Sequence, residues 1–123
     1  NYTFCKVNLK YDIESELPAN IRYTFLSIVK EALTNTAKHS NATRIDISLR
    51  EHPAFYQLIT QDNGNSENVQ KWSDHTSGIG MINIQERVQN ANGMIQITAR
   101  NGFRIFISIP KKEEKNDTDR DRR

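Results

Sequence analysis

The sequence has little cysteine, no long apolar run and almost no net charge. Its single cysteine, Cys5, cannot form a disulfide within the chain, which favours a reducing environment over a secreted one. No apolar run approaches the roughly 20 residues that a membrane-spanning helix needs, and no secretory signal is visible. The formal net charge is only +2, with much of the basic excess in the last few residues, which argues against nucleic acid as a partner. The histidines form no metal-ligand cluster in the sequence.

The remaining pattern is typical of one compact α/β domain. The 123 residues suffice for one shared core but not for two. Alternating apolar residues predict strands over 3–13, 43–51, 55–61, 94–100 and 103–109. Helical spacing predicts a long helix over 19–39 and a second helix from about 81 to 91. We expect the domain to cover 1–110 and a charged polar tail to cover 111–123.

The order of these elements predicts how they pack. A turn at His52-Pro53 makes the second and third strands antiparallel, and Asn101-Gly102 is a strong signal for a hairpin between the last two strands. Strand, helix, two strands, loop, helix and two strands together predict a two-layer α/β sandwich. In it, helices cover one face of a mostly antiparallel or mixed sheet. The sequence opens on a strand-like run without a start methionine, so we expect it to be part of something longer.

The long predicted helix carries a polar stripe beside its apolar face. Glu31, Asn35, Lys38 and His39 follow at steps of about one helical turn, so they share one side of the helix. An amide oxygen such as that of Asn35 can complete the coordination shell of Mg²⁺ where phosphates supply most of the charge. Glu31 could then orient a water, and Lys38 could offset phosphate charge. On spacing alone, a solvent-facing helix side with a Glu–Lys pair is favoured over a metal site, because such pairs are common.

A second candidate follows the third predicted strand, in Gln61-Asp62-Asn63-Gly64. An aspartate at the end of a strand can reach into a pocket while a glycine two residues on lets the backbone turn away. A buried carboxylate there would accept a hydrogen bond from an exocyclic amine such as that of adenine. Asp-Asn-Gly is also ordinary turn composition, so a plain turn is the alternative.

The third candidate is Gly78-Ile79-Gly80-Met81, where a polar loop meets the second predicted helix. Glycines let the backbone approach an anion, and the first amides of a helix point outward without partners. The helix dipole adds to the attraction for negative charge, so a triphosphate could sit there. A flexible loop end that needs glycines for clearance is the alternative.

Together, the three candidates occur in the order typical of one known family. EALTNTAKHSNATRIDISL resembles the asparagine box of the Bergerat-type ATP-binding fold, which gyrase, MutL and sensor histidine kinases share. Its Lys-His-Ser ending is similar to the NarX/DesK group of kinases. DNG resembles the first glycine box, GIGMINIQERVQNANG the second, and FRIFISIP the closing strand. The resemblance spans roughly residues 3–110 and is specific in combination.

The resemblance implies the ATP-binding catalytic domain of a two-component sensor histidine kinase, with ATP and Mg²⁺ as its ligands. It implies catalytic roles for Glu31 and Asn35, with Asn35 as the metal ligand. The implied nucleotide-binding residues are Asn35, Lys38, His39, Asp62, Gly64, Gly78, Ile79, Gly80 and Met81. Asp62 would read the adenine amine, and Gly78 and Gly80 would cradle phosphates. Residues 65–77 would form a short mobile lid over the nucleotide.

The implied partners lie outside this chain. None of its histidines is followed by an acidic residue, as the phosphoacceptor site of this kinase group would show. We therefore expect the acceptor histidine on dimerisation helices of the same protein that this chain lacks. The resemblance further implies a homodimer, a response regulator as partner, and a cytoplasmic domain of a membrane-bound bacterial sensor.

The sequence departs from the usual pattern of the family at three places. Asn65-Ser66 stands where the first box usually reaches a second glycine, Asn83 stands at a third glycine of the second box, and Phe103 replaces a threonine before the last strand. These departures keep open a degenerate module that binds nucleotide weakly and serves docking or regulation. An anti-sigma-factor serine kinase of the same fold is a further alternative.

Overall fold

The computed structural model describes residues 5–39, 41–64, 79–98 and 101–111. Its elements, in chain order, are β1 (Lys6–Asp12), α1 (Ala19–His39), β2 (Arg44–Glu51), β3 (Phe55–Asp62), α3 (Ile79–Asn90), β4 (Met94–Thr98) and β5 (Arg104–Pro110). The predicted lid over 65–77 and the predicted tail beyond residue 111 lie outside the described residues. Each predicted helix and strand has a counterpart here, and the long helix has the predicted bounds.

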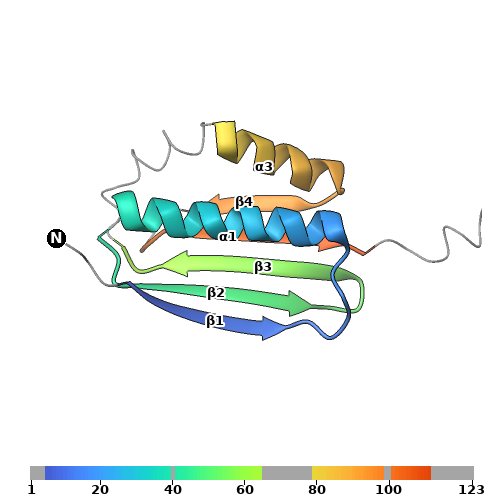
Figure 1. Ribbon diagram of the computed structural model, residues 1–123, viewed down its shortest axis with the longest axis horizontal. Coiled ribbons are helices and arrows are strands. Elements are labelled where there is room, and N and C mark those ends of the chain that lie inside the picture. The colour runs from blue at the N-terminus through green and yellow to red at the C-terminus, as the bar shows by residue number, and fades with distance from the viewer. Residues whose placement is uncertain (1–4, 40, 65–78, 99–100, 112–123) are drawn as a thin grey trace, which may run out of the picture.

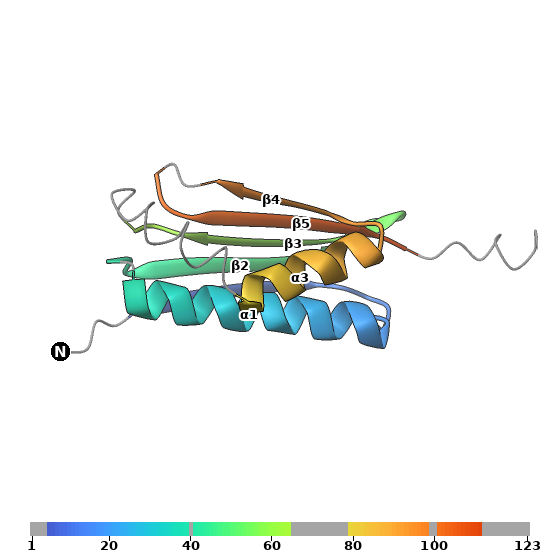
Figure 2. The ribbon, with the colours of Figure 1, turned by 90° about the horizontal axis from the view of Figure 1, so that it is seen from above.

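The five strands form one mixed sheet in the order β1-β2-β3-β5-β4. β1 runs parallel to β2, and the remaining pairs are antiparallel. Both helices lie on the same face of the sheet, as the view from above shows (Figure 2). The predicted two-layer sandwich and both predicted hairpins, β2–β3 and β4–β5, are therefore confirmed.

The core lies between the two layers and follows from the two periodicities of the sequence. Every second residue of β2, β3 and β5 faces the helices, and Leu58, Ile105 and Ile107 are fully buried. The buried stripe of α1 repeats at helical spacing through Ile21, Phe25, Ile28, Ala32 and Thr36. Each fully buried apolar side chain of this size contributes about 1.5–3 kcal/mol, so the packing of these faces holds the layers together.

The apolar side of β1 differs from the other strands because β1 is an edge strand. Val7, Leu9 and Tyr11 pair with β2 residues that face the helices, yet they are 50–60% exposed. Tyr11 lines an apolar groove between β1 and α1, together with Leu26 of the helix. Alternation thus predicted the strand correctly, but α1 does not cover this edge of the sheet.

The direction of the elements defines two ends of the molecule. In Figure 1, β3 and α1 both run leftward, so Asp62 and His39 finish at the same end, which we call the Asp62 end. The first turn of α3 also points toward this end. β2 runs the other way and finishes in Glu51 at the opposite end, which we call the Glu51 end. Within the described residues no helix combines the length and apolarity needed to span a membrane.

Candidate functional site

The Asp62 end gathers parts of the chain that are far apart in sequence. α1 brings its last turns, β3 its last residue, and β5 the residues that precede its first (Figure 1). These are the segments that carry the first two predicted candidates. Their meeting point is the side chain of Asp62, which is buried with only 4% of its surface exposed.

Asp62 accepts hydrogen bonds from three directions. Its Oδ1 accepts from the backbone N–H of Gly64 at 2.9 Å and from that of Phe103 at 3.1 Å. Its Oδ2 accepts from the hydroxyl of Thr36 on α1 at 3.2 Å. The backbone N–H of Asp62 in turn donates to the carbonyl of Phe103 at 3.0 Å. The carboxyl group is therefore fixed by β3, the β5 approach and α1 at once.

Neutral groups supply all of these donors. The ion pairs within the described part of the chain join other residues, Arg22–Glu16, Arg44–Asp46 and Lys111–Glu51. Cys5 adds no second charge beside Asp62, because burial raises the pKa of its thiol and the charge of Asp62 raises that pKa further. A carboxylate group can accept hydrogen bonds from a ligand as well as from the protein.

A glycine makes the approach to Asp62 possible. Gly102 has φ +109, in the region that side chains rarely adopt, and a Cβ placed there would lie 2.1 Å from the backbone oxygen of Asp62. The preceding Asn101 has φ 55. The predicted Asn-Gly turn therefore does more than connect two strands, since it lets Phe103 reach the carboxylate.

The side chain of Asn63 has different hydrogen-bond partners from that of Asp62. Its Oδ1 accepts from the backbone N–H groups of Thr43 and Arg44, at 2.9 and 3.0 Å. Its Nδ2 donates to the hydroxyl of Thr43 at 3.0 Å. Asn63 thus ties the end of β3 to the start of β2. The plain-turn interpretation of Asp-Asn-Gly fits this residue, and the buried-carboxylate interpretation fits Asp62.

Most of the other predicted residues are placed only by their backbone. Asn35, Lys38 and His39 lie in the last turns of α1, and their side chains are outside what the structure describes. Glu31 lies one turn earlier and is half-buried. In the second glycine box, Ile79, Gly80 and Met81 form the first turn of α3, while Gly78 lies outside the described residues.

α3 is held against α1 by a contact that the sequence did not indicate. The guanidinium of Arg87 lies 4.5 Å from the ring centroid of Tyr23, a cation–π arrangement between the two helices. This contact helps to fix the helix that opens with the second glycine box relative to the helix that carries Asn35.

Two positions that donate to Asp62 escaped the sequence interpretation, and one of them left a signal. Thr36 lies on the buried stripe of α1, one turn after Ala32, so a hydroxyl in an apolar stripe marked it as unusual. The backbone N–H of Phe103 left no signal, because any residue other than proline supplies one.

The three departures from the family pattern have different consequences. The side chain of Phe103 is buried, and its backbone still donates to Asp62, so this replacement retains a contact to the carboxylate. Asn83 is exposed on α3. Ser66 lies outside the described residues.

Comparisons with known proteins place these observations in a family. A family model described as histidine kinase-, DNA gyrase B-, and HSP90-like ATPase matches residues 22–113. The chain is 32% identical to the sensor histidine kinase YdfH of Bacillus subtilis, over 89% of this chain and 28% of that protein. It is 30% identical to the sensor protein VraS of Staphylococcus epidermidis, over 82% of this chain and 29% of that protein. The chain thus spans less than a third of the length of these curated relatives.

Solved structures show the same fold. A blue-light activated histidine kinase of Erythrobacter litoralis superposes with a TM-score of 0.67 at 18% identity, over 86% of this chain and 37% of that chain. The ATP-binding domain of PrrB from Mycobacterium tuberculosis superposes with a TM-score of 0.60 at 20% identity, over 89% of this chain and 82% of that chain.

Proposed function

The chain belongs to the family of histidine kinase-, DNA gyrase B- and HSP90-like ATPases, and from this premise we propose that it is the ATP-binding catalytic domain of a sensor histidine kinase. The observation that carries the proposal is the Asp62 carboxylate, buried and held by three neutral donors at one end of the sheet. The sensor kinases among its relatives support the choice within the family.

In this proposal Asp62 recognises the base of ATP. Its carboxylate accepts a hydrogen bond from the exocyclic amine of adenine. The three donors hold both oxygens in place, so no reorganisation is needed when the nucleotide arrives. Gly64 contributes in two ways, because its N–H holds Oδ1 and its lack of a side chain leaves room for the base.

The phosphates extend from the base toward the two helices. The first turn of α3, with Ile79, Gly80 and Met81 after Gly78, offers unpaired backbone N–H groups and the positive end of a helix dipole. Lys38 and His39, at the end of α1, lie beside the phosphates in this proposal. Their positive charge would offset part of the charge of the triphosphate.

In this proposal magnesium binds through the amide of Asn35. Within the described residues, no group of three or more His, Cys, Asp or Glu side chains could hold a metal ion by itself. The metal would therefore take most of its oxygen ligands from phosphates and water, with the Asn35 amide as the protein ligand and Glu31 orienting a bound water. When bound, the metal neutralises phosphate charge.

Catalysis by this domain would consist of positioning and charge neutralisation. The acceptor histidine would lie on dimerisation helices of the same protein, and a response regulator would receive the phosphoryl group. A homodimer attached to a bacterial membrane is the setting we propose for the longer protein. This chain alone would bind nucleotide without phosphorylating itself on histidine.

The first test is the thermal midpoint of unfolding with and without Mg²⁺ and a non-hydrolysable ATP analogue. Ligand at about 100 times its dissociation constant should add about 2.7 kcal/mol to the free energy of unfolding. Asn35→Ala should remove the magnesium-dependent part of the gain. Asn20→Ala, at the exposed far end of the same helix, is the matched control and should leave it intact.

The degenerate module predicts no shift in the midpoint at millimolar analogue. The backbone N–H of Phe103 still supports the Asp62 carboxylate, but any residue other than proline would supply that donor, so the binding measurement has to decide between the two. An Asn35→Ala variant with full magnesium-dependent binding would remove Asn35 from its proposed role.

A further inference from the structure

We propose that Thr36 is a positioning residue that sets the base specificity of the nucleotide site. Through its bond to Oδ2 of Asp62 it fixes the direction of the carboxylate oxygen that accepts from the base, and so favours a purine with an amine at position 6 over one with a carbonyl. This inference rests on the proposed function, because it concerns the same nucleotide site.

The acceptor capacity of Asp62 leads to this assignment. A carboxylate offers about four lone-pair sites, two on each oxygen. Oδ1 accepts from two backbone N–H groups, those of Gly64 and Phe103, which use both of its sites. Oδ2 accepts from Thr36. Counting the donors within the described residues, one site of Oδ2 is left for a ligand, and Thr36 determines its direction.

The hydroxyl proton of Thr36 goes to the carboxylate rather than to the helix. Thr24 and Ser27, earlier on α1, donate to the backbone carbonyl four residues before them, at 2.8 and 2.9 Å. Thr36 instead donates across the layers to a residue 26 positions away. A hydroxyl has one proton, so the oxygen of Thr36 can only accept from any further neighbour.

A carboxylate held in one direction discriminates between bases that differ in one group. An amine at position 6 donates to the open site of Oδ2. A carbonyl at that position places an oxygen against Oδ2, so the open site receives no hydrogen bond from that group. Sites built to bond a ligand N–H reject analogues without it strongly, because their buried polar groups are then unpaired.

Thr36 also connects the two halves of the nucleotide site. It follows Asn35 directly, so the turn of α1 that carries the proposed metal ligand also carries the residue that holds the base-reading carboxylate. A shift of this turn would therefore move both contacts together.

The experiment compares ATP with inosine triphosphate, which differs from ATP by a carbonyl in place of the 6-amine. Affinities are measured by calorimetry on the whole chain with Mg²⁺. In wild type, ATP should bind at least 100-fold more tightly. Thr36→Val keeps the shape of the side chain and removes the donor that holds Oδ2. It should lower the ratio of the two affinities about tenfold, because the carboxylate is then free to turn away from the 6-amine. Thr36→Ser keeps the hydroxyl and should keep the wild-type ratio. Thr36→Ala should lower the ratio as Thr36→Val does, and it replaces Thr36→Val in the experiment if that variant does not fold.

Thr24→Val is the matched control, since Thr24 is equally buried on the same helix but donates within the helix. It should leave the ratio unchanged. A Thr36→Val or Thr36→Ala variant with the wild-type ratio would overturn this inference and leave the proposed function standing. A wild type that binds neither nucleotide would overturn the proposed function, and this inference with it.

Discussion

Two carboxylates at opposite ends of the molecule, Asp62 and Glu51, use similar contacts for different purposes. Each is the last residue of its strand, and because β2 and β3 are antiparallel the two lie at opposite ends of the sheet. Each also accepts hydrogen bonds from segments far along the chain. They differ in one respect, which is that Glu51 faces a positive charge and Asp62 is held by neutral donors.

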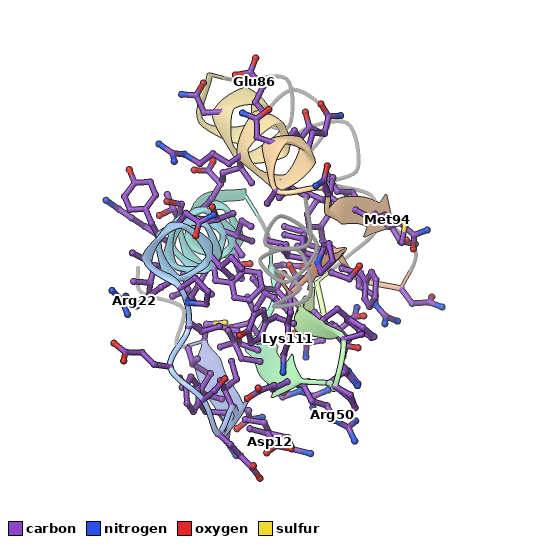
Figure 3. All side chains as sticks on the ribbon, turned by 90° about the vertical axis from the view of Figure 1, so that its right-hand side faces the viewer. Asp12, Arg22, Arg50, Glu86, Met94 and Lys111 are labelled. Atoms are coloured by element: carbon purple, nitrogen blue, oxygen red, sulfur yellow. The ribbon has the colours of Figure 1, made fainter. Side chains whose placement is uncertain are left out.

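Glu51 is fully engaged by the protein. Its Oε1 accepts from the backbone N–H groups of Glu14 and Ser15 at 2.9 and 3.0 Å. Its Oε2 accepts from the hydroxyl of Ser15 at 2.8 Å and from Lys111 Nζ at 2.6 Å. Lys111 follows β5, and Figure 3 looks onto this end of the molecule with Lys111 near its centre. Glu51 therefore joins the end of β2 to the β1–α1 connection and to the residue that follows β5.

The difference supports Asp62, rather than Glu51, as the carboxylate that binds the ligand in our proposal. All four lone-pair sites of Glu51 are occupied, and its charge is balanced by Lys111. When only the described donors are counted, one lone-pair site of Asp62 Oδ2 is left for a further donor. No described cation forms an ion pair with Asp62. A buried carboxylate without a described counter-ion is costly to the fold, and this supports the ligand-binding role that we propose for Asp62.

The largest expected effect separates the two carboxylates by nucleotide binding. Asp62→Asn should weaken ATP binding about 100-fold, because an amide N–H₂ replaces an acceptor that faces the base. Glu51→Gln should leave ATP affinity unchanged. Calorimetry of both variants, with circular dichroism to show that each is folded, provides the measurement. Equal losses in the two variants would break the comparison.

The next effect concerns the glycine beside Asp62. Gly102→Ala should lower the free energy of unfolding by about 3 kcal/mol, because positive φ and the clash with Asp62 act together. Asn92→Ala, at φ 61 after α3, carries the backbone penalty alone and should lower it by about 1 kcal/mol. Urea unfolding of the two variants gives both values. A Gly102→Ala variant that is no less stable than Asn92→Ala would show that the close approach to Asp62 adds no cost to the substitution.

The smallest effect is the pH dependence of the Glu51 end. The hydrogen bond from Lys111, followed by those from Ser15, lowers the pKa of Glu51 from 4.5 to about 2. Because the pKa is lower in the folded chain, its stabilising contribution is complete above pH 4.5 and is lost as the pH falls toward 2. The difference in thermal midpoint between wild type and Glu51→Gln should therefore be largest above pH 5 and shrink toward zero near pH 2.

Glu16→Gln is the matched control for this pH series. Glu16 is strongly exposed, and its ion pair with Arg22 is long at 3.9 Å, so it contributes little to stability. Its difference from wild type should stay small and flat from pH 5 to 2. A Glu51→Gln difference that did not change with pH would contradict the role assigned to Lys111.

The sequence predicted the elements well because periodicity reports burial. The helix over 19–39 and the alternating strands needed only the spacing of apolar residues such as Ile28, Ile47 and Ile107. The same signal could not show that Val7 and Leu9 stay exposed, since alternation does not distinguish an edge strand from a covered one.

The motifs of the candidate site could be predicted from the sequence, but the hydrogen bonds between its residues could not. Asp62 could be named because it ends an apolar strand before a glycine. The bond from Thr36 and the ion pair between Glu51 and Lys111 join residues 26 and 60 positions apart. Contacts of this kind depend on the register of the sheet and on the position of α1 over it, and a local sequence pattern does not encode either.

The most direct test of the central claim follows backbone amides by NMR during a titration with Mg²⁺ and an ATP analogue. The amides of Gly64 and Phe103 donate to Asp62, and those of Glu14 and Ser15 donate to Glu51, so each pair reports on one carboxylate. We predict saturable shifts at Gly64 and Phe103, with Glu14 and Ser15 unmoved. Shifts confined to Glu14 and Ser15, or absent from Gly64 and Phe103 at saturation, would contradict the account.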